Sequence, residues 1–558
     1  MHPWSSRRPD DRRKLALVII MALMICLSEA VRKRRRGNYT CPVLKRCSCL
    51  RRIDGLTVKC TSSSPDEEFD LDMAKLQGLF IVRFSMIKIS MPKFPDSWFK
   101  NHTIARLRVI ACGLREISEA DMCCFKNLSG IQLDGNKLQG VPIALNAARA
   151  LVTLLVRRNL IKHLQGMLDL PKLVRLDLSR NKIETLEEEY LTGLPKLRYL
   201  VLSQNSIHNL SPKLFRQAKS LVLVKLNNNH IHSVEGVFDH LSGLEVLDLN
   251  LNNICEADSI ARFTLSSLKE LTLEHNCISQ ITRFQNAQIQ RLVFRENFLT
   301  NVTAGAFQQL KKLTTLDLSN NSIAKLSDSL FARNSVLQEI NLSINKLTSA
   351  LMLFNNTQKI KIIKLSFNRI VDISLTFNGL TQLRELYMRY NLISSIPDGA
   401  FQDNFDLVHI DFTSNHIAWI GKSAFKGLLR LRVLHLHKNK IISLNGSASN
   451  LPKLHYLGAS QNAILRLEAG EFLNNLELTT ISLAANNISN VEGAFIGAFS
   501  LAHLNLAANQ LELLRRSDFS PDIIAPAVVL IEGYVSVFFS FIALMNIACM
   551  ATLNNYQH

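Results

Sequence analysis

A group of side chains suited to binding recurs over four successive segments in the last third of the chain. Its members are aromatic, basic or titratable: Tyr387, Arg389, His409, Asp411, His435, His437 and Tyr456. Aromatic residues and arginine dominate the energy of protein interfaces, so this group is a candidate ligand surface. A metal site built from the three histidines and a solvated surface without a ligand are the alternatives. If imidazolium charge contributes, affinity should strengthen below about pH 6.5.

No motif typical of catalysis accompanies this group. The chain contains no phosphate-binding Gly-Lys loop, no Gly-x-Ser-x-Gly turn and no His-Glu-x-x-His helix. We therefore expect a binding protein rather than an enzyme, with no cofactor and no metal.

The spacing of the group follows a pattern that covers most of the chain. A Leu-x-x-Leu-x-Leu-x-x-Asn-x-Ile frame, as at residues 173–183, 313–323 and 431–441, recurs about every 24 residues. Its asparagine stands at positions 136, 159, 181, 205, 229, 252, 276, 297, 321, 345, 368, 391, 415, 439, 462, 486 and 509, with Cys112 one repeat earlier. This is the leucine-rich-repeat signature.

The frame predicts an α/β repeat solenoid of about 18 repeats, a leucine-rich-repeat horseshoe with a parallel concave sheet. Alternating leucines make each frame a short strand with its leucines inward. The asparagines should satisfy backbone groups of adjacent turns. A phenylalanine column should pack opposite the sheet: Phe215, Phe307, Phe331, Phe401, Phe425, Phe472 and Phe495.

The register also predicts which side chains face outward from the sheet. These are the residues six, four and two positions before each asparagine, and most of them are small or polar. The binding group described above occupies such positions. A basic patch occupies the same positions near the start of the repeats: Arg157, Arg175, Tyr199 and Lys225.

The repeat resembles that of extracellular animal proteins, namely chaoptin, the Toll receptors and the leucine-rich-repeat-and-immunoglobulin membrane glycoproteins. The resemblance covers roughly residues 100 to 515 and includes Gly-Ala-Phe segments at residues 305–307 and 399–401. Cys41, Cys47, Cys49 and Cys60 resemble the cysteine-rich N-terminal cap of such proteins, although five residues rather than the usual three separate the first two. The resemblance implies the disulfides Cys41–Cys49 and Cys47–Cys60. Zinc binding is the alternative for four clustered cysteines.

The remaining cysteines are less informative. Cys112 is expected to be buried in the repeat core. A bond between Cys255 and Cys277 is an open alternative, because they lie in adjacent repeats but two positions out of register.

The ends of the chain carry the signals for its compartment. Residues 1–30 resemble a secretory signal peptide, with a basic start and an apolar run of 13 residues, and an uncleaved anchor is the alternative. The basic run at residues 32–36 resembles a processing-protease site or is a solvated stretch. It opens a segment, residues 31–70, that holds the cap; residues 71–520 form the solenoid and residues 521–558 an apolar tail. Residues 533–553 carry no formal charge and are long enough to span a bilayer.

Three interpretations of this tail remain open: a single-pass anchor, a lipid-anchor signal removed in processing, and an apolar end that packs on the last repeat. Candidate glycosylation sites fit a secreted or cell-surface chain. They are Asn38, Asn101, Asn127, Asn209, Asn301, Asn341, Asn355, Asn445 and Asn487, and Asn320 has the same motif.

The net charge of +19 favours acidic partners, although spread charge that only aids solubility is the alternative. We expect a cell-surface glycoprotein that binds an extracellular protein or an acidic glycan in adhesion or recognition. The alternatives are a Toll-like receptor ectodomain without its signalling domain and a secreted matrix or inhibitor protein. Membrane attachment through the tail and a homodimer belong to this expectation. No specific nucleic acid is indicated.

Overall fold

The computed structural model describes residues 40–44, 47–61, 73–95, 98–99, 102–122, 125, 127–263, 265–512, 514–519 and 528–530. The chain divides into two compact units, with the boundary between Asn229 and His230. Several predictions fall outside the described residues. They are the signal peptide, the basic run, the apolar span at 533–553, and the glycosylation candidates Asn38 and Asn101.

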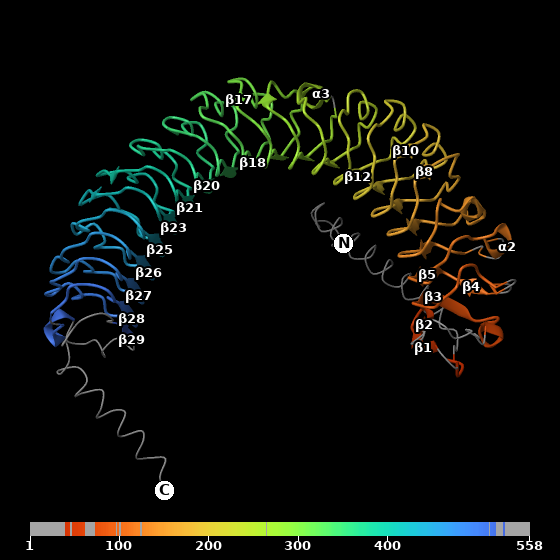
Figure 1. Cartoon of the computed structure of the whole chain (residues 1–558), viewed down its shortest axis with the longest axis horizontal. Coiled ribbons are helices and arrows are strands. Elements are labelled where there is room, and N and C mark those ends of the chain that lie inside the picture. Colours follow the sequence, from red (N-terminus) through yellow and green to blue (C-terminus); the bar gives the residue numbers. More distant parts are fainter. Residues whose placement is uncertain are drawn as a thin grey trace, which may run out of the picture. The chain divides into compact units, whose positions relative to one another are not determined.

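Unit 1 begins with an antiparallel hairpin and continues as a parallel series (Figure 1). The hairpin is β1 (Cys47–Arg52) and β2 (Gly55–Thr61), and β2 pairs in parallel with β3 (Phe80–Ile87). The series continues through β5 (Arg106–Ile110), β6 (Gly130–Gln132), β7 (Thr153–Leu155), β9 (Arg175–Asp177), β11 (Tyr199–Val201) and β12 (Leu223–Lys225). Short elements complete the unit: η1 (Met73–Leu76), β4 (Thr103–Ile104), α2 (Glu119–Met122), η2 (Ile143–Ala147), β8 (His163–Leu164) and β10 (Thr185–Leu186).

Unit 2 repeats the same turn. Its main strands are β13 (Val246–Asp248), β14 (Glu270–Thr272), β16 (Arg291–Val293), β18 (Thr315–Asp317), β19 (Glu339–Asn341), β20 (Ile362–Lys364), β21 (Glu385–Tyr387), β23 (His409–Asp411), β25 (Val433–His435), β26 (Tyr456–Gly458), β27 (Thr480–Ser482), β28 (His503–Asn505) and β29 (Val528–Leu530). The other elements are α3 (Asp258–Ala261), β15 (Gln280–Ile281), β17 (Asn301–Val302), β22 (Ser395–Ile396), β24 (Trp419–Ile420) and η3 (Arg516–Asp518).

The predicted leucine-rich-repeat solenoid is confirmed within each unit, with less helix than the α/β label implies. In the described residues the α-helices α2 and α3 have four residues each. The main strands form one side of each unit, which we call the sheet face, and the connecting turns form the other (Figure 1). None of the described helices has the length and apolar character needed to span a bilayer.

The leucines of each frame form the core. In the frame at residues 313–323, the side chains of Leu313, Leu316 and Leu318 are fully buried, while Thr315 and Asp317 between them are half-buried on the sheet face. Burial of one such leucine contributes about 1.5–3 kcal/mol. Stacking of turns therefore stabilises a sequence in which no single repeat could bury its own apolar side.

The ladder asparagines connect neighbouring turns. The Oδ1 atom of Asn345 accepts from the Ile323 N–H at 3.0 Å in the preceding turn. Its Nδ2 atom donates to the Leu318 oxygen at 3.0 Å and to the Leu342 oxygen at 3.1 Å. The same pattern recurs along both units, as at Asn181 and Asn439. The predicted role of the ladder is confirmed.

The residue before each ladder asparagine adopts a left-handed backbone. From Arg158 to Ala508 its φ lies between 52° and 59° at every turn. Non-glycine residues adopt this region rarely, and bulky or β-branched ones more rarely still. This position was not singled out in the sequence.

The phenylalanine column is buried as predicted. All seven residues are at most 1% exposed. Successive rings stack on each other, with centroids 6.1 Å apart for Phe307 and Phe331 and 6.0 Å apart for Phe401 and Phe425. They are therefore core residues.

Three disulfides are present in the described residues. Cys41–Cys49 and Cys47–Cys60 are the pairs that the resemblance implied, and Cys47 lies opposite Cys60 in the β1–β2 hairpin. Because all four sulfurs are bonded, the zinc alternative for the cap is wrong. Cys112 is free and buried, as expected.

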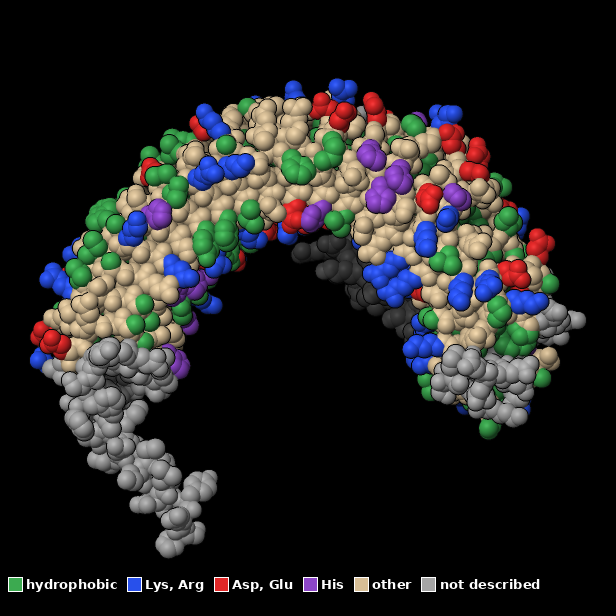
Figure 2. Space-filling model, viewed as in Figure 1, with side chains coloured by type: hydrophobic (Ala, Val, Ile, Leu, Met, Phe, Trp, Pro, Cys, Tyr) green, Lys and Arg blue, Asp and Glu red, His purple; other side chains and the backbone are tan. Residues whose placement is uncertain are grey.

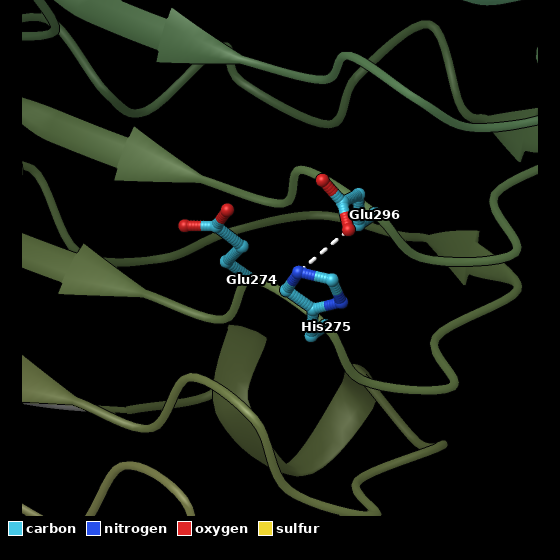
Figure 3. Close-up of side chains that lie close together, drawn as sticks. All are labelled: Glu274, His275 and Glu296. Carbon is cyan, nitrogen blue, oxygen red and sulfur yellow. Dashed lines mark ion pairs between the residues drawn. The ribbon is translucent and has the colours of Figure 1, made fainter.

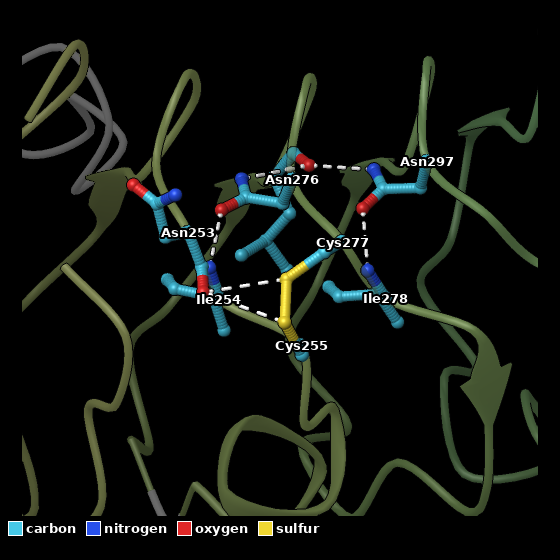
Figure 4. Close-up of a disulfide and its surroundings, with 8 residues drawn as sticks. Asn253, Ile254, Cys255, Asn276, Cys277, Ile278 and Asn297 are labelled. Carbon is cyan, nitrogen blue, oxygen red and sulfur yellow. Dashed lines mark hydrogen bonds between the residues drawn. A yellow bond between two sulfur atoms is a disulfide. The ribbon is translucent and has the colours of Figure 1, made fainter. Parts of the chain in front are cut away.

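The third disulfide, Cys255–Cys277, was left open by the sequence (Figure 4). Both sulfurs lie against the backbone oxygen of Asn253, at 3.6 and 3.3 Å. The two cysteines are two positions out of register in the repeat, and the bond therefore runs diagonally between adjacent turns.

Candidate functional site

The predicted binding residues lie together on the sheet face of unit 2. The strands β21, β23, β25 and β26 pair in parallel, with Tyr387 beside Asp411 and Asp411 beside His435. Arg389 and His437 follow their strands by two residues. Histidine side chains gather along this side of the unit (Figure 2). The repeat thus brings all seven residues into one surface, which we call the ring surface.

Five aromatic and imidazole rings form a continuous series across the ring surface. The Tyr387 and His409 rings lie 4.9 Å apart, and the His409 and His435 rings 5.4 Å apart. The series continues from His435 to His437 at 5.7 Å and to Tyr456 at 5.0 Å. All five side chains are half-buried, so a partner could contact ring faces that are already held in place.

Gly458 makes room for the imidazole of His437. A Cβ atom at this position would overlap the His437 ring and come within 2.8 Å of the Tyr456 ring. The His437 ring therefore occupies the space that a side chain at position 458 would fill, and it can reach the neighbouring rings of the series.

Carboxylates anchor the edge of the ring surface. Asp411 is 6% exposed and accepts from the Thr413 N–H at 2.9 Å. Arg389 Nε lies 3.6 Å from its Oδ2. The Tyr387 hydroxyl donates to Glu385 Oε2 at 2.9 Å, and burial with this bond raises the pKa of Tyr387 to about 12. Tyr387 therefore stays protonated at physiological pH.

The three histidine rings stay neutral to a lower pH than an unperturbed imidazole would. Burial lowers the pKa of His409, His435 and His437 below 6.5, and the charge of Asp411 opposes this shift only in part. Half-burial removes water from the rings, so the pH at which imidazolium charge would strengthen binding lies below the 6.5 taken from an unperturbed histidine. Any charge-dependent binding should begin at lower pH.

The structure gives no support to a metal site formed by these histidines. In the part of the chain that the structure describes, one group brings three metal-type ligand atoms within 4.8 Å of one another, and it is Glu274, His275 and Glu296 (Figure 3). His275 Nε2 lies 2.5 Å from Glu296 Oε2. Arg295 lies 2.7 Å from Glu296 and 3.5 Å from Glu274, so an arginine already offsets both carboxylates. We interpret this group as an ion-pair network.

An exposed apolar stripe on the same unit was missed. Ile344, Phe367 and Tyr390 stand just before successive ladder asparagines and are 48%, 46% and 43% exposed. The Phe367 and Tyr390 rings stack with centroids 4.4 Å apart. All three adopt the left-handed backbone that disfavours them, which costs of order 1 kcal/mol each. The sequence feature that could have revealed this stripe is a bulky apolar side chain just before the ladder asparagine, where most other turns have Asn, Arg, Gln, Ser or Ala.

The two arginines of the predicted basic patch in unit 1 lie beside carboxylates. Arg157 forms two bonds to Asp134 Oδ2, at 3.0 Å from Nε and 2.5 Å from Nη2. Arg175 lies 3.7 Å from Asp177, and Arg198 lies over the Tyr199 ring at 5.9 Å. The patch therefore presents less free positive charge than its sequence suggests.

Most described glycosylation candidates are accessible. Asn127, Asn209, Asn301, Asn355, Asn445 and Asn487 are exposed, as is Asn320. Asn341 differs, because it is half-buried on β19 and its Nδ2 donates to Asp317 Oδ2 at 3.2 Å.

Comparison with known proteins identifies the repeat. A leucine rich repeat family model matches residues 149–207, 196–254, 287–348, 358–417 and 405–464. Tsukushi-A of Xenopus laevis is 30% identical over 198 residues, which are 34% of this chain and 49% of Tsukushi-A. Mouse podocan is 27% identical over 327 residues, 49% of each chain, and human Toll-like receptor 3 is 40% identical over 99 residues, 17% of this chain and 11% of the receptor. These matches span about half or less of each relative.

Solved structures agree on the fold. A chain of the glycosylated Toll–Spatzle complex of Drosophila aligns with a TM-score of 0.63 and 20% identity, over 79% of this chain and 65% of that chain. A chain in a second structure of this complex aligns with a TM-score of 0.58 and 16% identity, over 92% of this chain and 94% of that chain.

Proposed function

Because the chain is a leucine-rich-repeat protein similar to Toll-like receptor 3, Tsukushi and podocan, we propose that it acts outside the cell by binding a protein partner in adhesion or recognition. The ring surface of unit 2 is the proposed contact. The observation that carries this proposal is the continuous series of five rings from Tyr387 to Tyr456, with arginine at its edge. Aromatic and arginine side chains are the residues in which binding energy concentrates.

The apolar stripe supports the same surface. Tyr390 follows Tyr387 by three residues, so the stripe and the ring surface share the turn of β21. Exposed apolar side chains in a strained backbone are maintained where they serve a purpose other than stability. The Toll–Spatzle complex is an instance in which a protein of this fold is found with a protein partner.

The proposal is tested by binding of the purified chain. We would screen it against a panel of extracellular proteins and measure each hit by biolayer interferometry. The double substitution Tyr387→Ala/His437→Ala should weaken binding by about ten-fold or more. A matched pair on the turn side, Lys422→Ala/Lys426→Ala, should leave the affinity unchanged. Equal affinity of the wild type and the ring-surface variant would remove this surface from the proposal.

Attachment to a membrane through residues 533–553 is a separate proposal, which rests on their length and lack of charge. A chain ending at Ser520 should appear in the culture medium while the full chain stays with the cells. Equal secretion of both would mean that the tail anchors nothing, and the protein would then act as a secreted binding protein.

A further inference from the structure

Three arginines surround a cavity on the sheet face of unit 1. Arg83 lies on β3, and Arg106 and Arg108 lie on β5. Because Phe84 lies opposite Leu107 in this parallel pair, Arg83 and Arg106 are neighbours across the two strands. Adjacent strands are about 4.8 Å apart, so two guanidinium groups leave the sheet side by side. Neither the predicted basic patch nor the ring surface includes these residues.

Gly130 opens the cavity. It lies beside Arg106 on β6, with Thr153 beside it on β7. A Cβ atom there would meet only the Arg106 side chain, with Cγ at 3.5 Å and Cδ at 4.0 Å, so glycine leaves an empty position where other turns place a side chain. The resulting cavity has a volume of about 610 Å³, and Ser129 and Thr153 line it with the arginines. Small-ligand sites have volumes of about 300–1,000 Å³.

The positive charge of the cavity is not compensated by the described part of the protein. There, no carboxylate forms an ion pair with Arg83, Arg106 or Arg108, whereas Arg157 is paired with Asp134. Like charges placed side by side on paired strands repel each other. An anionic ligand would remove this repulsion and satisfy donors that now face solvent.

Arg108 is held in a defined orientation. Its Nε donates to Gln132 Oε1 at 2.8 Å, and Gln132 Nε2 in turn donates to Asp134 Oδ2 at 2.5 Å. This hydrogen bond uses the Nε–H of the guanidinium group and leaves the two terminal nitrogens for a ligand. Planar guanidinium groups recognise oxyanions with two parallel hydrogen bonds.

We propose that this cavity binds the sulfate groups of an acidic polysaccharide. Three arginines supply the oxyanion contacts, and Thr153 offers a hydroxyl group to the sugar. The Ser129 hydroxyl donates to the Ala105 oxygen at 3.0 Å and can accept from the sugar. Among the residues that the structure describes, the cavity lining contains no aromatic side chain on which a nucleic acid base could stack, which favours a glycan over single-stranded nucleic acid. The ligand class rests on the proposed extracellular function, because sulfated polysaccharides occur outside cells.

The probe for this site is a heparin oligosaccharide, and the measurement is its affinity for the purified full chain over a series of salt concentrations. We expect binding that weakens as salt rises, because counterions are released from a charged chain. The variant Arg83→Gln/Arg106→Gln should lose at least ten-fold in affinity and show a shallower salt dependence. The control Arg149→Gln/Arg216→Gln removes the same charge from exposed turns and should keep wild-type affinity.

A second variant tests the cavity without changing charge. Gly130→Val places a side chain in the space beside Arg106 and suits a strand, so the fold should be retained, as circular dichroism would show. Heparin affinity should fall about as much as in the arginine variant. Equal losses in the control, or full affinity in Gly130→Val, would overturn the proposal by showing that binding follows overall charge.

Two further measurements separate the remaining outcomes. Duplex RNA that binds more tightly than heparin, with the same dependence on Arg83, Arg106 and Gly130, would overturn the glycan assignment. The ring-surface variant Tyr387→Ala/His437→Ala should keep heparin affinity, and the cavity variants should keep affinity for a protein partner. Failure of one proposal is thereby distinguishable from failure of the other.

Discussion

His437 Nε2 lies 3.0 Å from the Tyr456 hydroxyl, while the Ser460 backbone N–H donates to His437 Nδ1 at 3.1 Å. An Nδ1 atom that accepts a hydrogen bond carries no proton, so the neutral ring holds its proton on Nε2 and donates it to Tyr456. Protonation of Nδ1 would break the bond from Ser460. The ring surface is therefore built around a neutral imidazole.

The neutral histidines predict a loss of stability in acid. Burial lowers the pKa of His409, His435 and His437 in the folded chain, whereas unfolding returns it to about 6.5. Since the unfolded state then binds more protons, this stability is complete above pH 6.5 and is lost as pH falls through the lower folded pKa. Thermal unfolding between pH 7.5 and 4.5 should show a smaller decrease in Tm for His437→Gln than for the wild type. The exposed His232→Gln should follow the wild type, and a parallel decrease in all three proteins would contradict the prediction.

Glu471 predicts the opposite dependence. Its side chain is 1% exposed, its Oε1 has no hydrogen-bond partner among the described residues, and burial raises its pKa to about 7. A raised carboxyl pKa means that stability is complete below about pH 4.5 and is lost as pH rises towards 7. Glu471→Gln should therefore stabilise the fold at pH 8, by about 3 kcal/mol at most, and much less at pH 4.5.

Denaturant unfolding at the two pH values measures this difference. Glu492→Gln is the control, because Glu492 is exposed and does not contribute to the raised pKa of Glu471. Equal effects of Glu471→Gln at both pH values would show that the carboxyl is not protonated by burial.

Removal of one ladder asparagine should destabilise the chain strongly. Asn345→Ala leaves the Ile323 N–H and the Leu318 and Leu342 oxygens without their side-chain partner. An unsatisfied buried group costs about 1–3 kcal/mol, so the loss should exceed that of an ordinary surface substitution. The exposed Asn356→Ala should change unfolding by less than about 0.5 kcal/mol. Similar Tm values for the two variants would contradict the role of the ladder.

The disulfide between adjacent turns should add stability to unit 2. Closing a loop of this length contributes about 3 kcal/mol. Cys255→Ser/Cys277→Ser should lower the Tm, while Cys112→Ala should leave the disulfides intact because Cys112 is free. Peptide mapping without reduction should recover Cys255 linked to Cys277. A free thiol at either position would contradict the bond.

The sequence alone predicted those structural features that recur once in every repeat. Leu316, Asn345 and Phe331 occupy fixed positions in the frame, and the same register placed His435 and His437 on one face. Features that depend on contacts between unequal positions were not predictable. The Cys255–Cys277 bond runs diagonally between turns. Glu471 stands where other turns bury residues such as Leu330 and Ala400, so its burial follows the register, but its lack of a hydrogen-bond partner at Oε1 does not.

The site was predicted in part for the same reason. Tyr387 and Tyr456 follow the register of the ladder, so their neighbourhood could be inferred. Arg83 was missed because no ladder asparagine marks its strand, and the lowered pKa of His409 depends on burial that the sequence does not show. Phe367 and Tyr390 stand at a left-handed position whose conformation became evident only with the structure.

Phe367 offers a test that separates binding from stability. It has a φ of 58° and is 46% exposed, and asparagine tolerates this backbone region better than phenylalanine does. Phe367→Asn should therefore leave the Tm unchanged or raise it, while it weakens binding to a protein partner by removing the stacked pair with Tyr390. Differential scanning fluorimetry and biolayer interferometry on the same preparation measure the two effects. The matched Ser414→Asn, which changes the same position two turns beyond Phe367, should alter neither. A drop in Tm with unchanged affinity would show that Phe367 serves the fold and not the partner.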